Sequence, residues 1–89
     1  MARITLPARA DRAAAAALLP VLRDAVAAGD VSIDGAEVAH TGQAMLQLLI
    51  AARQSATAAG HGFELTASAA MRAALAIAGA EALVDGGAL

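Results

Sequence analysis

The feature that most constrains the fold is an alternation of short β-branched segments with longer helical ones. Val31 to Asp34 reads VSID, in which Val31 and Ile33 would point to one side of a buried strand. Helical segments flank it at Ala13 to Ala28 and at Gln43 to Ala59, and each carries apolar residues one turn apart. Strands that alternate with helices in this way form parallel βαβ units. The sequence therefore predicts an α/β domain, with three or four helices packed on a short, mostly parallel sheet.

Shorter segments extend this alternation toward both ends of the chain. We expect an edge strand at Ile4 to Leu6, which Pro7 would stop, and a third strand at Phe63 to Leu65. Ser68 is placed to accept a backbone hydrogen bond at the start of a last helix, Ala69 to Ala78.

The long helical segments have recognisable ends and faces. Asp11 can cap the first helix and Gly29 can end it, while Pro20 inside it predicts a kink or a regular part that begins nearer Pro20. The inward faces are expected to hold Leu46, Leu49, Ile50 and Arg53 in the second helix, and Met71, Leu75 and Ala78 in the last.

The length predicts a single domain, 1–89, with a modest core. Glu81 to Val84 is expected to add a final turn or strand, and 85–89 a flexible tail. The hydrophobic fraction of 60% overstates the core, because about a third of the residues are alanine and Phe63 is the only aromatic residue. Alanine buries little apolar area. Such a core leaves flat, mildly apolar surfaces that suit contact with a partner or with a second copy of the chain.

Composition argues against several classes of function. The chain has no cysteine, so it forms no disulfide, thiolate nucleophile or cysteine-based zinc site. A net charge of −2 and six scattered arginines argue against nucleic-acid binding, which needs a basic surface. The longest run without a charged residue, Val38 to Ala52, is too short and too polar to span a bilayer, and the first residues lack a signal-peptide core. We expect a cytoplasmic protein that does not insert into membranes.

Patterns for catalysis and metal binding are missing from the sequence. His40 and His61 flank one helical segment and should lie about 25 Å or more apart, too far to share a metal ion. Asp34 and Glu37 resemble a carboxylate pair, but Asp34 ends a strand and Glu37 lies in the following loop. There is no Gly-x-Ser-x-Gly elbow, and Gly60-His61-Gly62 precedes a strand rather than the helix that a phosphate loop needs. We therefore expect no enzyme activity, no metal and no cofactor.

Several segments together resemble a STAS domain, the fold of the bacterial anti-sigma factor antagonists and of the tails of sulfate transporters. The matching segments are Leu6-Pro7, the helix from Asp11 to Val26, VSIDGAEV, HTGQAMLQLLIAAR and HGFELTASAAMRAALAIAGAEAL. They are most similar to the small stand-alone STAS proteins of chemotaxis and signalling operons, which often carry a run such as Leu46 to Leu49. The resemblance implies a small STAS-like fold, and it implies a structural turn role for an aspartate such as Asp34.

The resemblance also bears on the polar turn before the second long helix, which reads His40-Thr41-Gly42-Gln43. In STAS antagonists this turn reads Asp-Ser-Ser-Gly-Leu or Asp-Thr-Ala-Gly-Leu, and a partner kinase phosphorylates one hydroxyl at a helix N-terminus that tolerates phosphate. When the chain is aligned on Leu46, the position that is usually phosphorylated falls on Ala44, which has no hydroxyl. Thr41 is the only hydroxyl left in the turn. We expect it to be the N-cap of the helix or the residue just before the N-cap, and the alternative is a displaced phosphorylation site.

These features favour a non-enzymatic STAS-type protein–protein interaction module in bacterial signal transduction, either chemotaxis-type or similar to an anti-sigma factor antagonist. The missing acceptor favours a module that works without phosphorylation. The alternatives are a STAS subunit of a phospholipid-transport ABC complex, an antagonist phosphorylated on Thr41, and a binder of a small anionic ligand at the turn. The expected partners are a signalling kinase, a chemotaxis component, an ABC ATPase or a second copy of the chain. The expected partner-binding residues are His40, Thr41, Gln43, Ala44, Gln47, Leu48 and Ala51, from the turn and from the face of the helix that should point outward. The alternative for Leu48 is that it packs against the helix from Ala13 to Val26 and belongs to the core.

Overall fold

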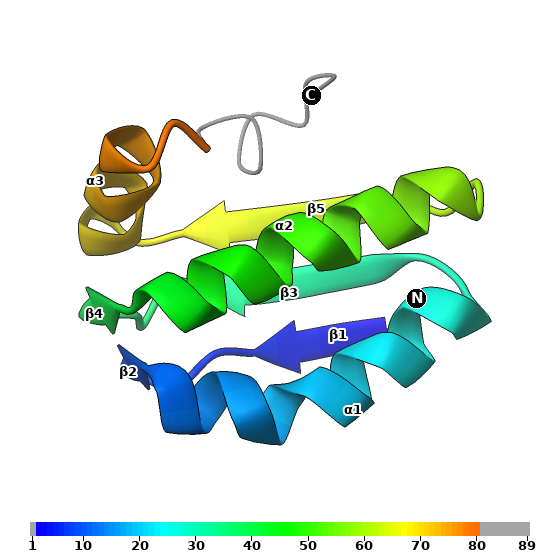
Figure 1. Ribbon diagram of the computed structural model, residues 1–89, viewed down its shortest axis with the longest axis horizontal. Helices are drawn as coiled ribbons and strands as arrows, with labels where there is room; N and C mark the ends of the chain where they lie inside the picture. The colour runs from blue at the N-terminus through cyan, green and yellow to red at the C-terminus, as the bar shows by residue number, and fades with distance from the viewer. Residues whose placement is uncertain (1, 81–89) are drawn as a thin grey trace.

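A computed structural model of the chain describes residues 2–80 (Figure 1). Along this range the elements are β1 (Ala2–Thr5), β2 (Arg9–Ala10), α1 (Arg12–Ala28), β3 (Val31–Gly35), β4 (His40–Thr41), α2 (Gln43–Ala58), β5 (Phe63–Ala67) and α3 (Ala69–Ile77). The predicted alternation of strands and helices is confirmed. The expected turn or strand at 81–84 and the tail at 85–89 lie outside the described residues.

Three strands form the central sheet in the order β1-β3-β5, and all of them run parallel. Val31 in β3 is opposite Ala2 on one side and Phe63 on the other, so β1 is an edge strand as expected. A second parallel pair, β2 with β4, places Arg9 opposite His40. The short parallel sheet and the three helices of the described range confirm the expected α/β fold class.

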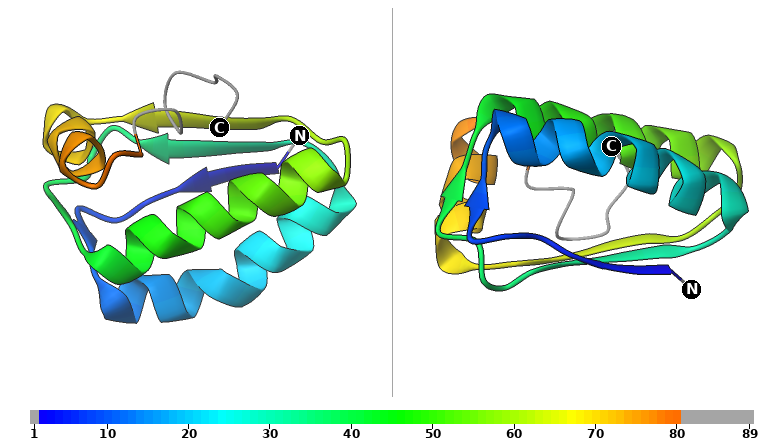
Figure 2. Two further views of the ribbon diagram at one scale, coloured as in Figure 1. Left: turned by 45° about the horizontal axis from the view of Figure 1, so that its top comes forward. Right: turned by 90° about the horizontal axis from the view of Figure 1, so that it is seen from below.

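The long helices and the sheet form two layers (Figures 1 and 2). α1 and α2 lie side by side on one face of the sheet, and α3 lies at the end where the strands finish. On the covered face the strand residues are apolar, and Val31 and Ile33 are fully buried. The alternate residues on the other face are polar, and there Arg3 Nη2 lies 3.8 Å from Asp34 Oδ2. The core therefore lies between the sheet and the two long helices.

The inward faces of the helices agree with expectation at most positions. Leu46, Leu49 and Arg53 of α2 are buried, and so are Met71 and Leu75 of α3. Two residues differ from expectation. Ile50 is only partly buried, because it lies on the flank of α2 next to α3, and Ala78 is exposed, because α3 ends at Ile77 and Ala78 is its C-cap.

The ends of α1 follow local hydrogen-bonding rules. Asp11 Oδ1 accepts a hydrogen bond from the Ala14 N–H at 3.0 Å, and this bond is the main cause that lowers the pKa of the Asp11 carboxyl, with the charge of Arg9 adding to it. At the other end the Gly29 N–H donates to the Ala25 carbonyl. The regular part of α1 begins at Arg12, so the alternative start near Pro20 was wrong. The helix changes direction near its middle in Figures 1 and 2, as expected where proline removes a backbone bond.

Ser68 caps α3 as predicted. Its Oγ accepts from the Met71 N–H at 3.1 Å and donates to the Val38 carbonyl, so the cap also ties α3 to the loop after β3. Across residues 2–80 no helix has the length and apolar character needed to cross a membrane.

Candidate interaction surface at the start of α2

The start of α2 is held in place by the β2–β4 strand pair. Gly42 is the N-cap residue, and its N–H donates to the Ala10 carbonyl at 2.9 Å. The Gly42 carbonyl accepts the first helical bond, from the Leu46 N–H at 3.2 Å. Glycine has no side chain to accept a bond, so α2 begins without a side-chain cap. The position of this helix end therefore depends on strand pairing rather than on capping.

Thr41 is not the N-cap of α2, so that part of the prediction was wrong, but it occupies the position just before the N-cap residue Gly42, which was the other part of the expectation. Thr41 belongs to β4, where it is opposite Ala10, and the helix begins only after Gly42. The strand pairing fixes the Thr41 backbone, and no hydrogen bond joins its hydroxyl to the start of α2. Its Oγ1 is buried and has no hydrogen-bond partner in the described part of the chain. A kinase could not reach this hydroxyl unless the segment opened.

Thr41→Val should leave the free energy of unfolding unchanged or raise it by about 1–2 kcal/mol. The substitution keeps the shape of the side chain and removes a buried hydroxyl that gains no bond. If Thr41 were a cap, its loss would instead lower the free energy of unfolding by about 1 kcal/mol. Urea denaturation of both proteins distinguishes these results. Thr66→Val on the exposed face of β5 is the matched control and should change stability by less than about 0.5 kcal/mol.

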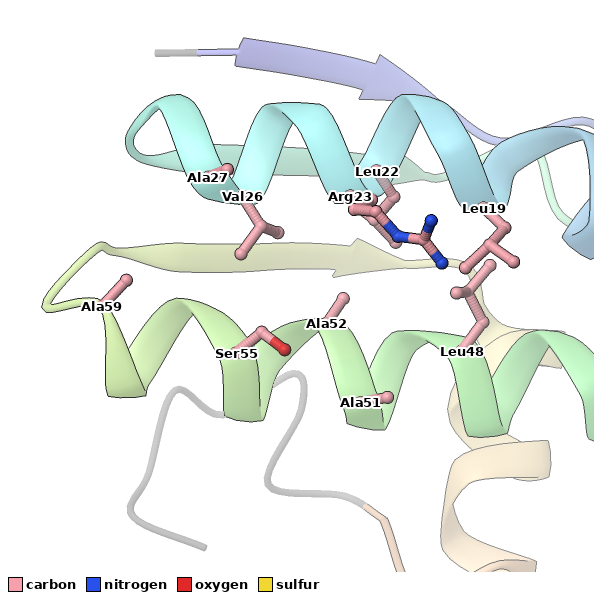
Figure 3. A pocket seen from close by; sticks show the side chains of 10 residues that line it. All are labelled: Leu19, Leu22, Arg23, Val26, Ala27, Leu48, Ala51, Ala52, Ser55 and Ala59. Carbon is pink, nitrogen blue, oxygen red and sulfur yellow. The ribbon is translucent and has the colours of Figure 1, made fainter.

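Of the residues that were expected to point outward from α2, two are exposed and two are partly buried. Gln47 and Ala51 are exposed, as predicted. Leu48 is only partly exposed and points toward Leu19 of α1 (Figure 3), and Ala44 is partly buried against the core. The prediction that Leu48 and Ala44 face outward was therefore wrong, and the alternative, in which Leu48 packs against the first helix, agrees with the structure. Their flank of α2 is not opposite the sheet, and α1 lies close enough to pack against Leu48.

The other flank of α2 borders a hollow beside α3. It has a volume of about 410 Å³ and is lined by Thr41, Gln43, Leu46, Gln47, Ile50, Ala74, Ile77 and Ala78. Ile77 is 90% exposed, more than any other large apolar side chain of the described range. Gln43 and Gln47 on α2 are exposed as well. We call Gln43, Gln47, Ile50 and Ile77 the α2–α3 surface.

Sequence reasoning missed Ile77, although a signal was present. At about 100° per residue, Ile77 lies well away from the face of α3 that carries Met71 and Leu75. An apolar residue at such a position does not pack in the core, so the need for a core does not account for its presence. α3 and α2 are separated in the sequence and come together only in the folded protein. The sequence therefore did not indicate that Ile77 would lie beside α2.

In the described part of the chain, the histidines and carboxylates do not converge on a catalytic or metal site. His40 is exposed in β4, whereas His61 follows α2, and its Nδ1 donates to the Val26 carbonyl at 2.8 Å. His61 therefore has a structural bond between the ends of α2 and α1. Asp34 Oδ1 accepts from the Ala36 N–H at 3.0 Å, which is the turn role expected for it. Among residues 2–80 no three histidine, cysteine, aspartate or glutamate side chains are grouped so that they could hold a metal ion.

Comparisons of the chain with protein-family models, with curated proteins and with solved structures gave no match. The candidate interaction surface combines the start of α2 with the exposed side chains of the neighbouring α3.

Proposed function

We propose that the chain is a non-enzymatic, STAS-type protein–protein interaction module in bacterial signal transduction, and that it works without being phosphorylated. The signalling class, chemotaxis-type or similar to an anti-sigma factor antagonist, comes from the resemblance of the α2 segment, whose run from Leu46 to Leu49 is similar to that of small stand-alone STAS proteins. The partner is a protein, such as a signalling kinase or a chemotaxis component. It docks on the α2–α3 surface.

The exposure of Ile77 is the observation that carries this proposal. A side chain that is 90% exposed contributes little to the core, and its burial in a complex would stabilise that complex by about 1.5–3 kcal/mol. Gln43 and Gln47 stand nearby and can form hydrogen bonds with a partner. An apolar centre with polar groups around it is the composition found in protein interfaces.

The state of the hydroxyls supports independence from phosphorylation. Ala44, which aligns with the usual acceptor, has no hydroxyl, and Thr41 Oγ1 is buried. A phosphate on Thr41 would place a charge of about −2 where its hydroxyl now lies inside the protein. The switch that controls docking in phosphorylated antagonists therefore has no accessible acceptor in this turn.

Incubation with a GHKL-type kinase and ATP should leave the turn unmodified. The expected intact mass is that of the unphosphorylated protein, because an exposed acceptor is missing at 40–44. A known STAS substrate of the same kinase serves as the positive control. Stoichiometric phosphate that maps to Thr41 would contradict the proposal and favour the phosphorylated-antagonist alternative.

Affinity capture of the partner with two matched variants tests the proposed function. Ile77→Glu places a charge at the centre of the α2–α3 surface, and Ala76→Glu places the same charge on the neighbouring exposed residue, outside the hollow. We expect a signalling kinase or receptor component to be captured by the wild type and by Ala76→Glu but not by Ile77→Glu. Capture of an ABC ATPase would instead favour the alternative function, a STAS subunit of a phospholipid-transport ABC complex. Equal capture by both variants would show that the partner does not dock on the α2–α3 surface.

A further inference from the structure

A second apolar depression lies between α1 and α2, on the side of these helices away from the sheet (Figure 3). It has a volume of about 460 Å³, and we call it the α1–α2 groove. Its floor includes Leu22 and Val26, which are buried. Leu19 of α1 and Leu48 of α2 face each other across one end. Leu19 is 42% exposed, so this end of the groove offers apolar surface to solvent.

The walls of the groove are low over the rest of its length. α2 contributes Ala51, Ala52, Ser55 and Ala59, and α1 contributes Ala27. Short side chains allow a third helix to approach to the usual interaxial distance of about 8–10 Å. An extended strand would find no partners for its backbone, because the backbone groups of both walls are already bonded within their helices. The shape therefore fits a helix rather than a strand.

A positive charge in the groove indicates which kind of side chain its occupant should carry. Of the described residues that line the groove, Arg23 is the only charged one, and its guanidinium extends along the groove toward Leu19 and Leu48 (Figure 3). Within residues 2–80 Arg23 forms no ion pair or hydrogen bond. α2 carries no acidic residue at all, so the facing wall offers no carboxylate either. A ligand that fills this groove would place its own carboxylate beside Arg23.

We propose that the α1–α2 groove binds an amphipathic helix of a partner protein that carries one aspartate or glutamate beside an apolar stripe. The apolar residues recur at i, i+3 or i+4, and i+7, and they cover Leu19, Leu22 and Leu48. The carboxylate pairs with Arg23, whose planar guanidinium binds a carboxylate through two parallel bonds. The groove lies on the opposite flank of α2 from the α2–α3 surface, so both surfaces can be occupied at once.

A displayed library of helical peptides tests this proposal directly. Peptides are selected on the wild-type protein and counter-selected on Leu19→Glu, a partly exposed position at which a charge should not prevent folding. We expect the enriched peptides to share an acidic residue beside an apolar stripe. Peptides without a common acidic residue, or no enrichment over the counter-selection, would overturn the proposal.

A charge exchange then tests the ion pair. For an enriched synthetic peptide, Arg23→Glu should weaken binding about tenfold or more, and a lysine in place of the peptide acid should restore it. Arg12→Glu, on the same helix but outside the groove, should change the affinity less than twofold. An affinity that is the same for wild type and Arg23→Glu would contradict the proposal. Binding must also persist in Ile77→Glu, so that failure here is separate from failure of the α2–α3 surface.

Light scattering of the protein alone tests the competing occupant. We expect a monomer across the concentrations used for peptide binding. A concentration-dependent dimer that Leu19→Glu dissociates would assign the groove to a second copy of the chain and would overturn the proposal. Circular dichroism of each variant confirms that it is folded before any binding result is interpreted.

Discussion

Leu49→Ala should lower the free energy of unfolding by about 3–5 kcal/mol. Leu49 is fully buried in the middle of α2, within the cluster that also holds Val31 and Ile33 of the central strand. The substitution loses apolar burial and leaves a cavity, because the surrounding side chains relax only in part. A domain of this size has a total stability of the same order, so the variant should be largely unfolded at moderate urea concentrations. Urea denaturation followed by circular dichroism gives the difference.

Leu48→Ala is the matched control, one residue along the same helix. Leu48 is partly exposed on the flank toward α1, so we expect a loss of about 1–2 kcal/mol. The comparison tests the rotation of α2 about its own axis. Equal losses for the two variants, or a larger loss for Leu48→Ala, would show that the helix presents a different face to the sheet.

Gly35→Ala should destabilise the domain by about 3 kcal/mol. Gly35 ends β3 beside Met71 of α3, and a Cβ there would lie 2.8 Å from Met71 Sδ and 2.9 Å from the Thr66 carbonyl oxygen. The methionine can move, but the carbonyl belongs to the neighbouring strand and is fixed by the sheet. The extra methyl group therefore forces the strands apart or displaces α3.

Gly29→Ala is the control for Gly35→Ala, because it makes the same chemical change at the end of α1. No atom of the described residues outside its own chain neighbours lies within 4 Å of a Cβ at Gly29, so the free energy of unfolding of Gly29→Ala should change by less than about 1 kcal/mol. Adding Met71→Ala to Gly35→Ala removes the sulfur but not the carbonyl, so it should not restore stability. Full stability in Gly35→Ala alone would mean that α3 does not pack against the end of β3.

The main elements could be predicted because their signals are local. The β-branched residues of β3 and the spacing of Leu46 and Leu49 indicated a buried strand and an amphipathic helix, and both are present. Asp11 and Ser68 were identified as caps because a side-chain oxygen before a helix bonds within its own segment. In each cap the donor and the acceptor are only three residues apart, so the local sequence is enough to identify the bond.

The start of α2 could be predicted only in part, since its structure depends on distant segments. β2 and β4 are two residues each, too short to show a period, yet their pairing removes Thr41 from the cap position. Leu48 is half-buried because α1 lies beside it, and a helical projection of α2 alone could not decide between an outward Leu48 and one that packs against α1. Ile77 belongs to the α2–α3 surface because the fold places α3 beside α2. Each of these differences arises from tertiary contact rather than from local propensity.

The most direct test of the central claim is a titration of the purified partner against wild type, Ile77→Glu and Ala76→Glu, each with and without prior kinase treatment. A charge buried without a partner at the centre of the α2–α3 surface should weaken binding about 30-fold or more for Ile77→Glu, with no change for Ala76→Glu. Kinase and ATP should leave all three affinities as they were. Equal affinities for wild type and Ile77→Glu, or a loss of wild-type binding after kinase treatment, would contradict a phosphorylation-independent module that docks through this surface.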